Sequence, residues 1–389
     1  MQEGFYRDTW VEVNLDAISQ NVSAMKKLIG EQTKIIAVVK ANAYGHGAIQ
    51  VAHAALESGA SMLAVAFLDE AIQLRQAGFD CPILVMGATR AQDVHVAVSY
   101  GITLTIFSLD WAKEASHYVD QGDVLLHVKV DTGMGRLGVR GVDELQAILE
   151  FAQEHEHFHI EGIFTHFATA DETNSPYYLK QLTKFQEVIA DVPKGNLLIH
   201  CANSAAGLKD KASLYNAVRQ GISMYGLTPS VEMKKELPFE LHEAFSLKTK
   251  LVHVKQLKKG DKVSYGATYE AEESEWIGTL PIGYADGWLR KLQDSEVLIE
   301  GKRMQLVGRI CMDQCMVKLP YELPVGTNVT LIGRQGNEVI SSDEVAERLE
   351  TINYEVPCTI SSRVPRIFFK KQRIIEKANP LLLKRPGKV

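Results

Sequence analysis

The most constraining feature of this chain is a regular alternation of short apolar runs and longer amphipathic stretches between about residues 16 and 240. The eight apolar runs are 35–39, 63–67, 83–86, 103–107, 124–130, 160–164, 197–199 and 217–225. Such runs are typical of strands buried on both faces, as in parallel sheets. Helix-like segments lie between them, at 48–58, 69–77, 91–99, 109–120, 142–155 and 177–190. Because eight strands can close a ring, the pattern predicts an α/β fold with an N-terminal (β/α)8 TIM-like barrel; an open doubly wound sheet is the alternative.

The pattern changes after about residue 244. Residues 247–256 nearly alternate between apolar and polar side chains, as a half-exposed strand does. Gly260-Asp261, Gly301-Lys302 and Gly336-Asn337 then separate short strands at hairpin-like spacing, and only 343–350 looks helical. We therefore expect three parts: a barrel over 12–243, a C-terminal mostly-β domain over 244–375 that includes 1–11, and a flexible tail over 376–389.

Composition narrows the functional classes. The formal net charge of -6 gives no electrostatic basis for binding nucleic acid or an anionic membrane. The first ten residues lack the apolar core of a signal peptide, and no run approaches the ~18 apolar residues of a membrane span. The cysteines are odd in number and scattered, at Cys81, Cys201, Cys311, Cys315 and Cys358. Reduced thiols in a cytoplasmic protein are therefore expected.

Lys40 ends the first apolar run and leads directly into residues 41–47, Ala-Asn-Ala-Tyr-Gly-His-Gly. An amine at the carboxyl end of a buried strand lies where an apolar wall meets a loop, which disfavours the ammonium form. Such an amine is suited to form a Schiff base. The glycines allow a ligand to approach the backbone, and Tyr44 offers a hydroxyl on a rigid ring. On position alone, a lysine that simply extends into solvent is the more common interpretation.

Three further polar clusters end the last three runs of the predicted barrel. His166 follows the sixth run, residues 200–204 (His-Cys-Ala-Asn-Ser) the seventh, and Arg219 to Gly226 lie at the eighth. In such barrels the site lies at the carboxyl ends of the strands, and phosphate often binds after the last two. The Gly221-Ile222 amides can donate to phosphate, and Ser204 can add a hydroxyl. Each cluster alone is more often structural, but together with Lys40 they favour one site.

Residues 131–138, Asp-Thr-Gly-Met-Gly-Arg-Leu-Gly, formally match a dinucleotide-binding G-x-G-x-x-G pattern. We reject that interpretation because the following helix is expected to begin near Val142, so the glycines do not open it. A glycine-rich bend that presents Arg136 to a carboxylate fits better, and a tight turn with a surface arginine is the structural alternative.

Two histidine and cysteine groupings suggest a metal without completing a site. His155, His157 and His159 lie where a helix runs into a strand, with no acid or thiol cluster beside them. Cys311 and Cys315 are likewise incomplete as a zinc site. No metal is expected.

Tyr265 and Tyr284 lie in segments rich in glycine and tyrosine. Strand tyrosines commonly serve for packing, and a tyrosine can exchange protons only if its pKa falls well below ~10.

The segment Val39 to Gly47 resembles the pyridoxal-phosphate attachment segment of alanine racemases. The resemblance extends from about Arg7 to Phe369. It includes 66–70 (Ala-Phe-Leu-Asp-Glu), 165–168 (Thr-His-Phe-Ala), 200–204, 263–266 (Val-Ser-Tyr-Gly) and 308–313 (Gly-Arg-Ile-Cys-Met-Asp). It implies a pyridoxal 5'-phosphate-dependent isomerase that interconverts L-alanine and D-alanine through an aldimine and supplies D-alanine for cell-wall peptidoglycan. It also implies a homodimer with active sites at the interface.

The resemblance also assigns roles to individual residues. Lys40 would hold the cofactor and act as one base, and Tyr265 of a partner subunit would act as the other. Arg219 would face the pyridine nitrogen with His200 behind it, and His166 would lie against the ring. Arg136 and the Met312 amide would bind the substrate carboxylate, and Lys129 is the lysine that the family often carbamylates. The phosphate would be held by Tyr44, Ser204, Gly221, Ile222 and Tyr354, with Asn203, Tyr284, Cys311 and Asp313 as supporting residues.

This assignment is chemically coherent, because racemisation removes a proton from one face of Cα and returns one to the other. A single base would mostly return its proton to the same face, so two groups on opposite sides are required. The cofactor makes the Cα–H bond acidic by delocalising the carbanion. An arginine at the ring nitrogen should keep that nitrogen unprotonated, because two cations repel each other.

Three other functions are alternatives to alanine racemisation. A pyridoxal-phosphate carrier on the same barrel generally ends after the barrel, whereas this chain adds about 130 residues that contain Tyr265. An amino-acid decarboxylase shares a barrel plus β domain, but the context of its catalytic cysteine is not found here. A serine-preferring racemase is harder to separate, since a small pocket shift accommodates one hydroxyl.

Overall fold

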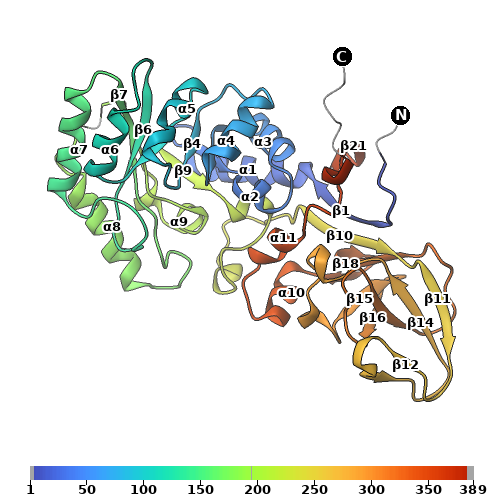
Figure 1. Ribbon diagram of the computed structural model, residues 1–389. Coiled ribbons are helices and arrows are strands. Elements are labelled where there is room, and N and C mark those ends of the chain that lie inside the picture. The colour runs from blue at the N-terminus through green and yellow to red at the C-terminus, as the bar shows by residue number, and fades with distance from the viewer. Residues whose placement is uncertain (1–3, 194, 383–389) are drawn as a thin grey trace, which may run out of the picture. The chain divides into compact units, whose positions relative to one another are not determined.

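The computed structural model describes residues 4–193 and 195–382. Contacts divide the chain into two compact units, each described here by itself (Figure 1). The barrel unit comprises Ala17–Ala43 and Ala48–His242. The β unit comprises the chain up to Asp16, the short segment Tyr44–Gly47 and the chain from Glu243 onward.

The barrel unit contains eight parallel strands, one for each predicted apolar run. They are β2 (Lys34–Val38), β3 (Ala60–Val65), β4 (Ile83–Val85), β5 (Leu104–Ile106), β6 (Val124–Lys129), β7 (Phe158–Phe164), β8 (Leu198–His200) and β9 (Ala217–Gln220). They pair in the orders β4-β3-β2-β9 and β5-β6-β7-β8. A parallel bridge between Leu84 and Thr103 joins β4 to β5, and the Arg219 amide donates to Ala202 O at 3.0 Å beyond β8. The ring therefore closes, which confirms the barrel and makes the open-sheet alternative wrong.

Helices follow the strands and lie around the outside of this ring (Figure 1). They are α1 (Leu15–Ile29), α3 (Ala48–Glu57), α4 (Leu68–Gln76), α5 (Val94–Ser99), α6 (Leu109–Ser116), α7 (Val142–Glu154), α8 (Pro176–Val188) and α9 (Ser204–Lys209). Caps explain several of the starts: Ser108 and Ser175 accept hydrogen bonds from the amides of Trp111 and Tyr178, and Pro176 occupies the first turn. The expected helix over 91–99 begins as a 3-10 turn, Ala91–Asp93.

The β unit is built on one large sheet and a two-stranded ribbon, β12 (Lys262–Val263) with β13 (Tyr269–Glu270). Along the sheet the order is β11-β14-β17-β16-β15-β18-β10-β1-β20-β21, with β19 attached to β18. All pairs are antiparallel except β1 with β20. The strands are β1 (Thr9–Asn14), β10 (Phe245–Lys250), β11 (His253–Leu257), β14 (Glu275–Leu280), β15 (Glu296–Ile299), β16 (Lys302–Val307), β17 (Cys315–Leu319), β18 (Asn328–Gln335), β19 (Glu338–Ile340), β20 (Arg366–Lys370) and β21 (Arg373–Ala378).

Hairpins form at Gly301 and Gly336, between β15 and β16 and between β18 and β19, which confirms two predicted turns. The strand predicted over 247–256 is wrong as a single element, since β10 pairs with β1 and β18 whereas β11 pairs with β14. The helix predicted over 343–350 is present as α10 (Ser342–Leu349), but α11 (Glu355–Thr359) was not predicted.

Two of the expected domain ends, the boundary after residue 11 and the start of the tail at residue 376, lie inside strands of the β unit. All of β1 belongs to the large sheet, so the boundary predicted between residues 11 and 12 lies inside a hydrogen-bonded strand. Strand β21 continues to Ala378 and a 3-10 turn follows at Pro380–Leu382. The rest of the predicted tail, residues 383–389, lies outside the described residues.

Candidate active site

A cavity of about 310 Å³ opens at the carboxyl ends of the barrel strands. Five of the predicted site residues line it: Lys40, Lys129, Arg136, His166 and Arg219. Its other lining residues are Ala66, Met86, Gly87, Met134, Leu137 and Phe164, which supply mostly apolar walls. An enclosed space with apolar walls and a few convergent basic groups is suited to a small anionic ligand.

Lys40 opens a left-handed turn, α2 (Lys40–Tyr44), that was predicted only as a loop. Ala41, Asn42 and Ala43 have φ near 52–53° and ψ of 47–54°, and Tyr44 has φ 51°. Left-handed backbone is disfavoured for residues with a Cβ, and such strain persists only where the surroundings fix it. The Glu70 carboxylate accepts the Ala41 amide at 2.6 Å and also the Ala66 amide at 2.8 Å, which ties this turn to the loop after β3.

Arg219 lies on β9 and is 3% exposed. Its Nη1 donates to His200 O and contacts His200 Nδ1 at 2.8 Å, while its Nη2 donates to Thr165 O and Cys201 O. These four contacts use all four terminal N–H groups. Among the described residues no carboxylate pairs with Arg219 and no acceptor binds its Nε. The Nε–H group is therefore the donor that remains for a ligand.

Three imidazoles surround this guanidinium. His200 is buried and contacts Arg219 on one side and His127 Nδ1 on the other, at 2.9 Å through its Nε2. Burial, and then the charge of Arg219, lower the pKa of His127 to about 3. The same two causes hold the pKa values of His166 and His200 well below the ordinary value. The three rings are therefore neutral. Arg219, the cation, contacts His200, and His200 contacts His127.

Lys129 ends β6 and is 5% exposed. Its Nζ has no hydrogen-bond partner among the described residues and lies 5.0 Å from the centre of the Phe164 ring. Burial, followed by the charges of Arg219 and Arg136, holds the pKa of Lys129 well below its ordinary value. A buried amine beside two guanidinium groups, with its ammonium form disfavoured, is an unusual arrangement of the kind that marks functional sites.

Arg136 is presented by the glycine-rich bend after β6, as predicted from the sequence. Asp131 Oδ1 accepts the amides of Gly133 and Gly135, and Gly138 packs so closely that a Cβ would lie 2.7 Å from Lys129 O. The following helix, α7, begins at Val142, so these glycines do not form its first turn. The bend therefore does not have the geometry of a dinucleotide-binding loop.

The predicted phosphate-binding residues of the barrel unit also come together. Ser204 begins α9, which Asn203 caps by accepting the Ala206 amide at 3.0 Å. Ser204 Oγ accepts the Gly221 amide at 2.9 Å and the Ser223 amide at 3.4 Å, and Ile222 lies between these two residues. The Ser223 hydroxyl is buried without a partner among the described residues. This cluster of donors is suited to an anion.

Tyr44 and Tyr354, the other predicted phosphate ligands, both belong to the β unit. Their ring centres lie 6.3 Å apart. Burial raises the pKa of Tyr44, so its phenol stays protonated and can donate a hydrogen bond. The segment that carries Tyr44 is fixed by Gly45, whose carbonyl accepts Arg366 Nε at 3.1 Å and where a Cβ would lie 2.1 Å from Pro357 O.

A second hollow, of about 660 Å³, lies in the β unit. Its lining includes the predicted residues Tyr265, Cys311, Met312 and Asp313. Tyr265 is 67% exposed and Met312 is 52% exposed. Tyr284 lies next to the same loop, since its amide donates to Cys311 O at 3.0 Å. The structure thus brings the predicted β-unit residues together as an exposed group.

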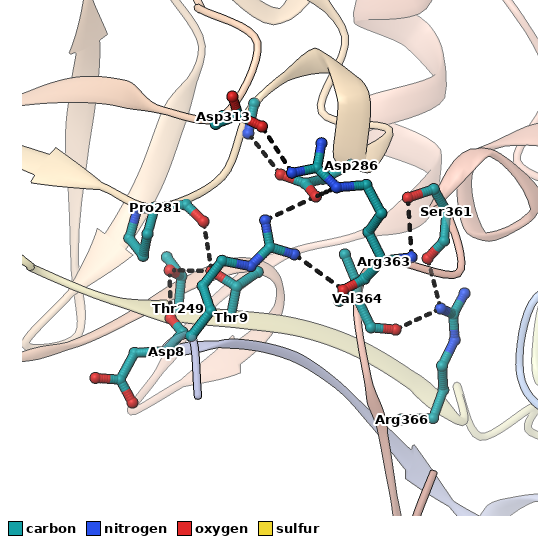
Figure 2. Close-up of polar contacts among 12 residues, drawn as sticks. Asp8, Thr9, Thr249, Pro281, Asp286, Asp313, Ser361, Arg363, Val364 and Arg366 are labelled. Atoms are coloured by element: carbon teal, nitrogen blue, oxygen red, sulfur yellow. Dashed lines mark hydrogen bonds and ion pairs between the residues drawn. The ribbon is translucent and has the colours of Figure 1, made fainter. Parts of the chain in front are cut away.

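A charged network fixes the loop that carries Met312. Asp286 is fully buried and pairs with Arg7 at 2.8 Å and with Arg363 Nε at 3.7 Å. Arg363 Nη2 in turn binds Asp313 Oδ1 at 2.7 Å (Figure 2). This network links the amino-terminal segment, the turn at 284–286 and the Met312 loop within the β unit.

Sequence reasoning missed some of these contributors. His127 lies inside a strand, where its pattern is that of an ordinary core residue, and Glu70 in the first turn of α4 has the pattern of an ordinary helix-start acid. The described ranges contain no group of three or more His, Cys, Asp or Glu placed to hold a metal ion. Within the same ranges no helix is both long and apolar enough to cross a membrane.

Comparison with known proteins agrees with this geometry. The family model described as "Alanine racemase, N-terminal domain" matches residues 13–229, and "Alanine racemase, C-terminal domain" matches 244–368. Alanine racemase of Geobacillus stearothermophilus is 58% identical over 378 residues, 97% of each chain. The crystal structure of alanine racemase from Bacillus anthracis with bound L-Ala-P is 51% identical, with a TM-score of 0.94 over 97% of this chain and 99% of that one. A histidine racemase from Leuconostoc mesenteroides subsp. sake is 32% identical, with a TM-score of 0.89 over 94% and 99%.

Proposed function

The chain belongs to the alanine racemase family, and on that premise we propose that it interconverts L-alanine and D-alanine with pyridoxal 5'-phosphate, using Lys40 and Tyr265 as its two bases. It is an isomerase of the racemase type. The observation that carries the proposal is the barrel cavity, lined by Lys40 and by the buried guanidinium of Arg219, whose Nε–H has no acceptor within residues 4–193 and 195–382.

The residues present fit the cofactor. Lys40 lines the cavity, and its amine is the group that would bond covalently to the aldehyde of the cofactor. Arg219 Nε–H suits a ring nitrogen that acts as acceptor. The Ile222 amide and the Ser204 hydroxyl suit a phosphate, and the Gly221 amide orients that hydroxyl by donating to Ser204 Oγ. Tyr44 and Tyr354 would add phenol donors to that phosphate. When bound, the cofactor supplies the electron sink that makes the substrate Cα–H acidic.

The protein's own part in the reaction is to hold the substrate and move protons. Arg136 and the Met312 amide would bind the carboxylate, with Cys311, Asp313 and Tyr284 fixing the loop of Met312. Lys40 Nζ would take or return a proton on one face of Cα, and Tyr265 Oη on the opposite face. His166 and His200, being neutral, would orient Arg219 and Tyr265 without adding charge.

Arg219 tunes the cofactor by charge. A guanidinium held by three backbone carbonyls cannot move away or lose its proton at neutral pH, so it would disfavour a second positive charge on the ring nitrogen. By keeping that nitrogen unprotonated, Arg219 would make the bound cofactor a weaker electron sink and so favour racemisation over transamination.

We also propose a cytoplasmic homodimer in which Tyr265 and Met312 reach the site of the partner subunit. The exposure of Tyr265 and Met312 around the 660 Å³ hollow supports this dimer, because a phenol and a backbone amide on an open surface can bind a substrate closely only when the partner subunit covers them. The D-alanine formed would serve cell-wall peptidoglycan. Growth of a D-alanine auxotroph that expresses this chain tests the cellular role.

The direct test is purification, a scan for the visible absorbance of lysine-bound cofactor, and loss of optical rotation with L-alanine. Lys40→Ala should abolish both signals. Lys34→Ala is the matched control, because Lys34 is an exposed lysine at the start of β2, at the end of that strand away from Lys40. Full racemisation by Lys40→Ala would refute the proposal.

The same assay separates the rival functions. Alanine, serine and histidine are compared as substrates, since one structural relative is named a histidine racemase. Absorbance without turnover on any amino acid would indicate a carrier, and carbon dioxide release would indicate a decarboxylase.

A further inference from the structure

The backbone that carries Tyr265 is strained at the residue before it. Ser264 has φ 68° and ψ 179°, a conformation that is essentially restricted to glycine. Gly266 and Ala267 also have positive φ, 75° and 50°. A serine holds such a conformation only where its surroundings over-determine it, and strain of this kind clusters at functional sites.

The Ser264 carbonyl accepts the Ala267 amide at 3.1 Å within its own turn, and the contacts of its side chain come from the loop that carries Met312. Ser264 Oγ donates to Arg309 O at 2.6 Å and lies 3.5 Å from Cys311 Sγ. A Cβ on Gly308 would lie 2.9 Å from both Ser264 Cβ and Val263 O, so the two backbones are in close contact. The strained residue is therefore clamped directly to residues 308–311.

The Met312 loop is in turn fixed from its other side. The amides of Tyr284 and Ala285 donate to the carbonyls of Cys311 and Met312, at 3.0 and 3.1 Å. A Cβ on Gly283 would lie 2.3 Å from Cys311 O, so these backbones also touch. The buried Asp286 holds the turn through its ion pairs with Arg7 and Arg363.

We propose that Ser264 is a positioning residue that sets Tyr265 relative to the Met312 amide, by clamping a strained backbone to the Arg309 carbonyl. The inference rests on the proposed function, in which Tyr265 is one base and Met312 binds the substrate carboxylate. With both groups on one clamped unit, the distance from the phenol to the bound Cα is fixed before substrate arrives.

Two variants separate the hydroxyl from the strain. Ser264→Ala removes the hydroxyl and leaves the strain unopposed, so the loop should relax and kcat should fall about 100-fold, as for a misplacement of roughly 1 Å. Ser264→Gly removes the same hydroxyl, but glycine adopts this conformation without strain, so it should retain more activity than Ser264→Ala. Simple loss of packing would give the opposite order.

The isotope effect on Cα–H cleavage identifies the base that is affected. Because Tyr265 serves one face only, deuteration of Cα should slow Ser264→Ala more than wild type with one alanine enantiomer and less with the other. Thr268→Ala is the control, since Thr268 is exposed on the same loop and its hydroxyl makes no hydrogen bond to any described residue. It should leave turnover and both isotope effects unchanged.

Wild-type isotope effects for both enantiomers in Ser264→Ala, or higher activity in Ser264→Ala than in Ser264→Gly, would overturn the inference. Thermal melting shows whether each variant folds. If Ser264→Ala does not fold, Ser264→Gly should show the isotope effect that differs between the two enantiomers, and its absence there would overturn the inference. Absence of racemisation by the wild type would instead refute the proposed function, so the two failures are distinct.

Discussion

Lys40 and Tyr265 belong to different compact units of the chain, and this allows the proposed dimer to be tested by mixing two inactive variants. Lys40→Ala lacks one base and Tyr265→Ala lacks the other, so each homodimer has two defective sites. If each site takes Lys40 from one subunit and Tyr265 from the other, a mixed dimer has one complete site and one site with neither base. Mixing should therefore restore activity.

The size of the restored activity follows from this arrangement. Random exchange of equal amounts makes about half of the dimers mixed, each with one of its two sites intact, so the mixture should reach about a quarter of the wild-type rate per subunit. The assay is the loss of optical rotation with L-alanine, after mild dissociation and reassociation. Exchange itself is monitored with two affinity tags on the two variants.

The double variant, Lys40→Ala with Tyr265→Ala, provides the reverse experiment. Mixed with wild type, it forms dimers in which both sites lack one base, so activity should fall from about half to about a quarter of that of pure wild type as subunits exchange. Proven exchange with no activity in the first mixture and no fall in the second would show that both bases come from one chain. That result would refute the shared-site reasoning.

The buried basic cluster of the barrel gives the remaining predictions. Arg219→Glu should raise the ratio of transamination to racemisation, measured as pyruvate formed per turnover; an unchanged ratio would contradict the charge argument. Burial and the charges of Arg219 and Arg136 disfavour the ammonium form of Lys129 by lowering its pKa, so this amine should bind carbon dioxide as a carbamate, seen as a carbonyl signal in ¹³C NMR with labelled bicarbonate and lost in Lys129→Ala; no signal in wild type would contradict it. His127 has a pKa of about 3 in the folded protein against 6.5 in the unfolded chain, so between these values the unfolded state binds the extra proton. The free energy of unfolding should therefore fall as the pH drops through this range, by up to about 1.4 kcal/mol per pH unit for this group, and urea titrations at several pH values should show a shallower slope in His127→Gln.

Much of the barrel is readable from local pattern, because a strand buried on both faces must be apolar throughout. Each of the eight runs contains a strand, although the last run, 217–225, is a strand only over Ala217–Gln220 and a 3-10 helix over Ile222–Tyr225. Lys40, Arg219 and His166 share a cavity because parallel strands place their carboxyl ends at one rim. Ring closure itself rests on two long-range pairings that no local pattern encodes, the bridge between Leu84 and Thr103 and the hydrogen bond from the Arg219 amide to Ala202 O.

Features that depend on tertiary context were not predictable. The left-handed turn after Lys40 contradicts the preference of alanine and is held by Glu70 from the first turn of α4. The break between β10 and β11 comes from their different partners, since the alternating pattern of 247–256 continues across it. His127 matters only because the fold brings it to His200 on another strand.

The turn at Ala41–Tyr44 limits how this protein can be made more heat-resistant. Four successive left-handed residues with side chains cost about 1–2 kcal/mol each, a sum comparable to the net stability of a typical domain. Glycine in place of Ala41 and Ala43 would relieve part of this strain and raise the melting temperature, while keeping the Asn42 side chain, which accepts the Ala48 amide, and the Tyr44 phenol. The same change would loosen the backbone that positions Lys40, the proposed base. Heat resistance and a fixed Lys40 position therefore depend on the same backbone bonds.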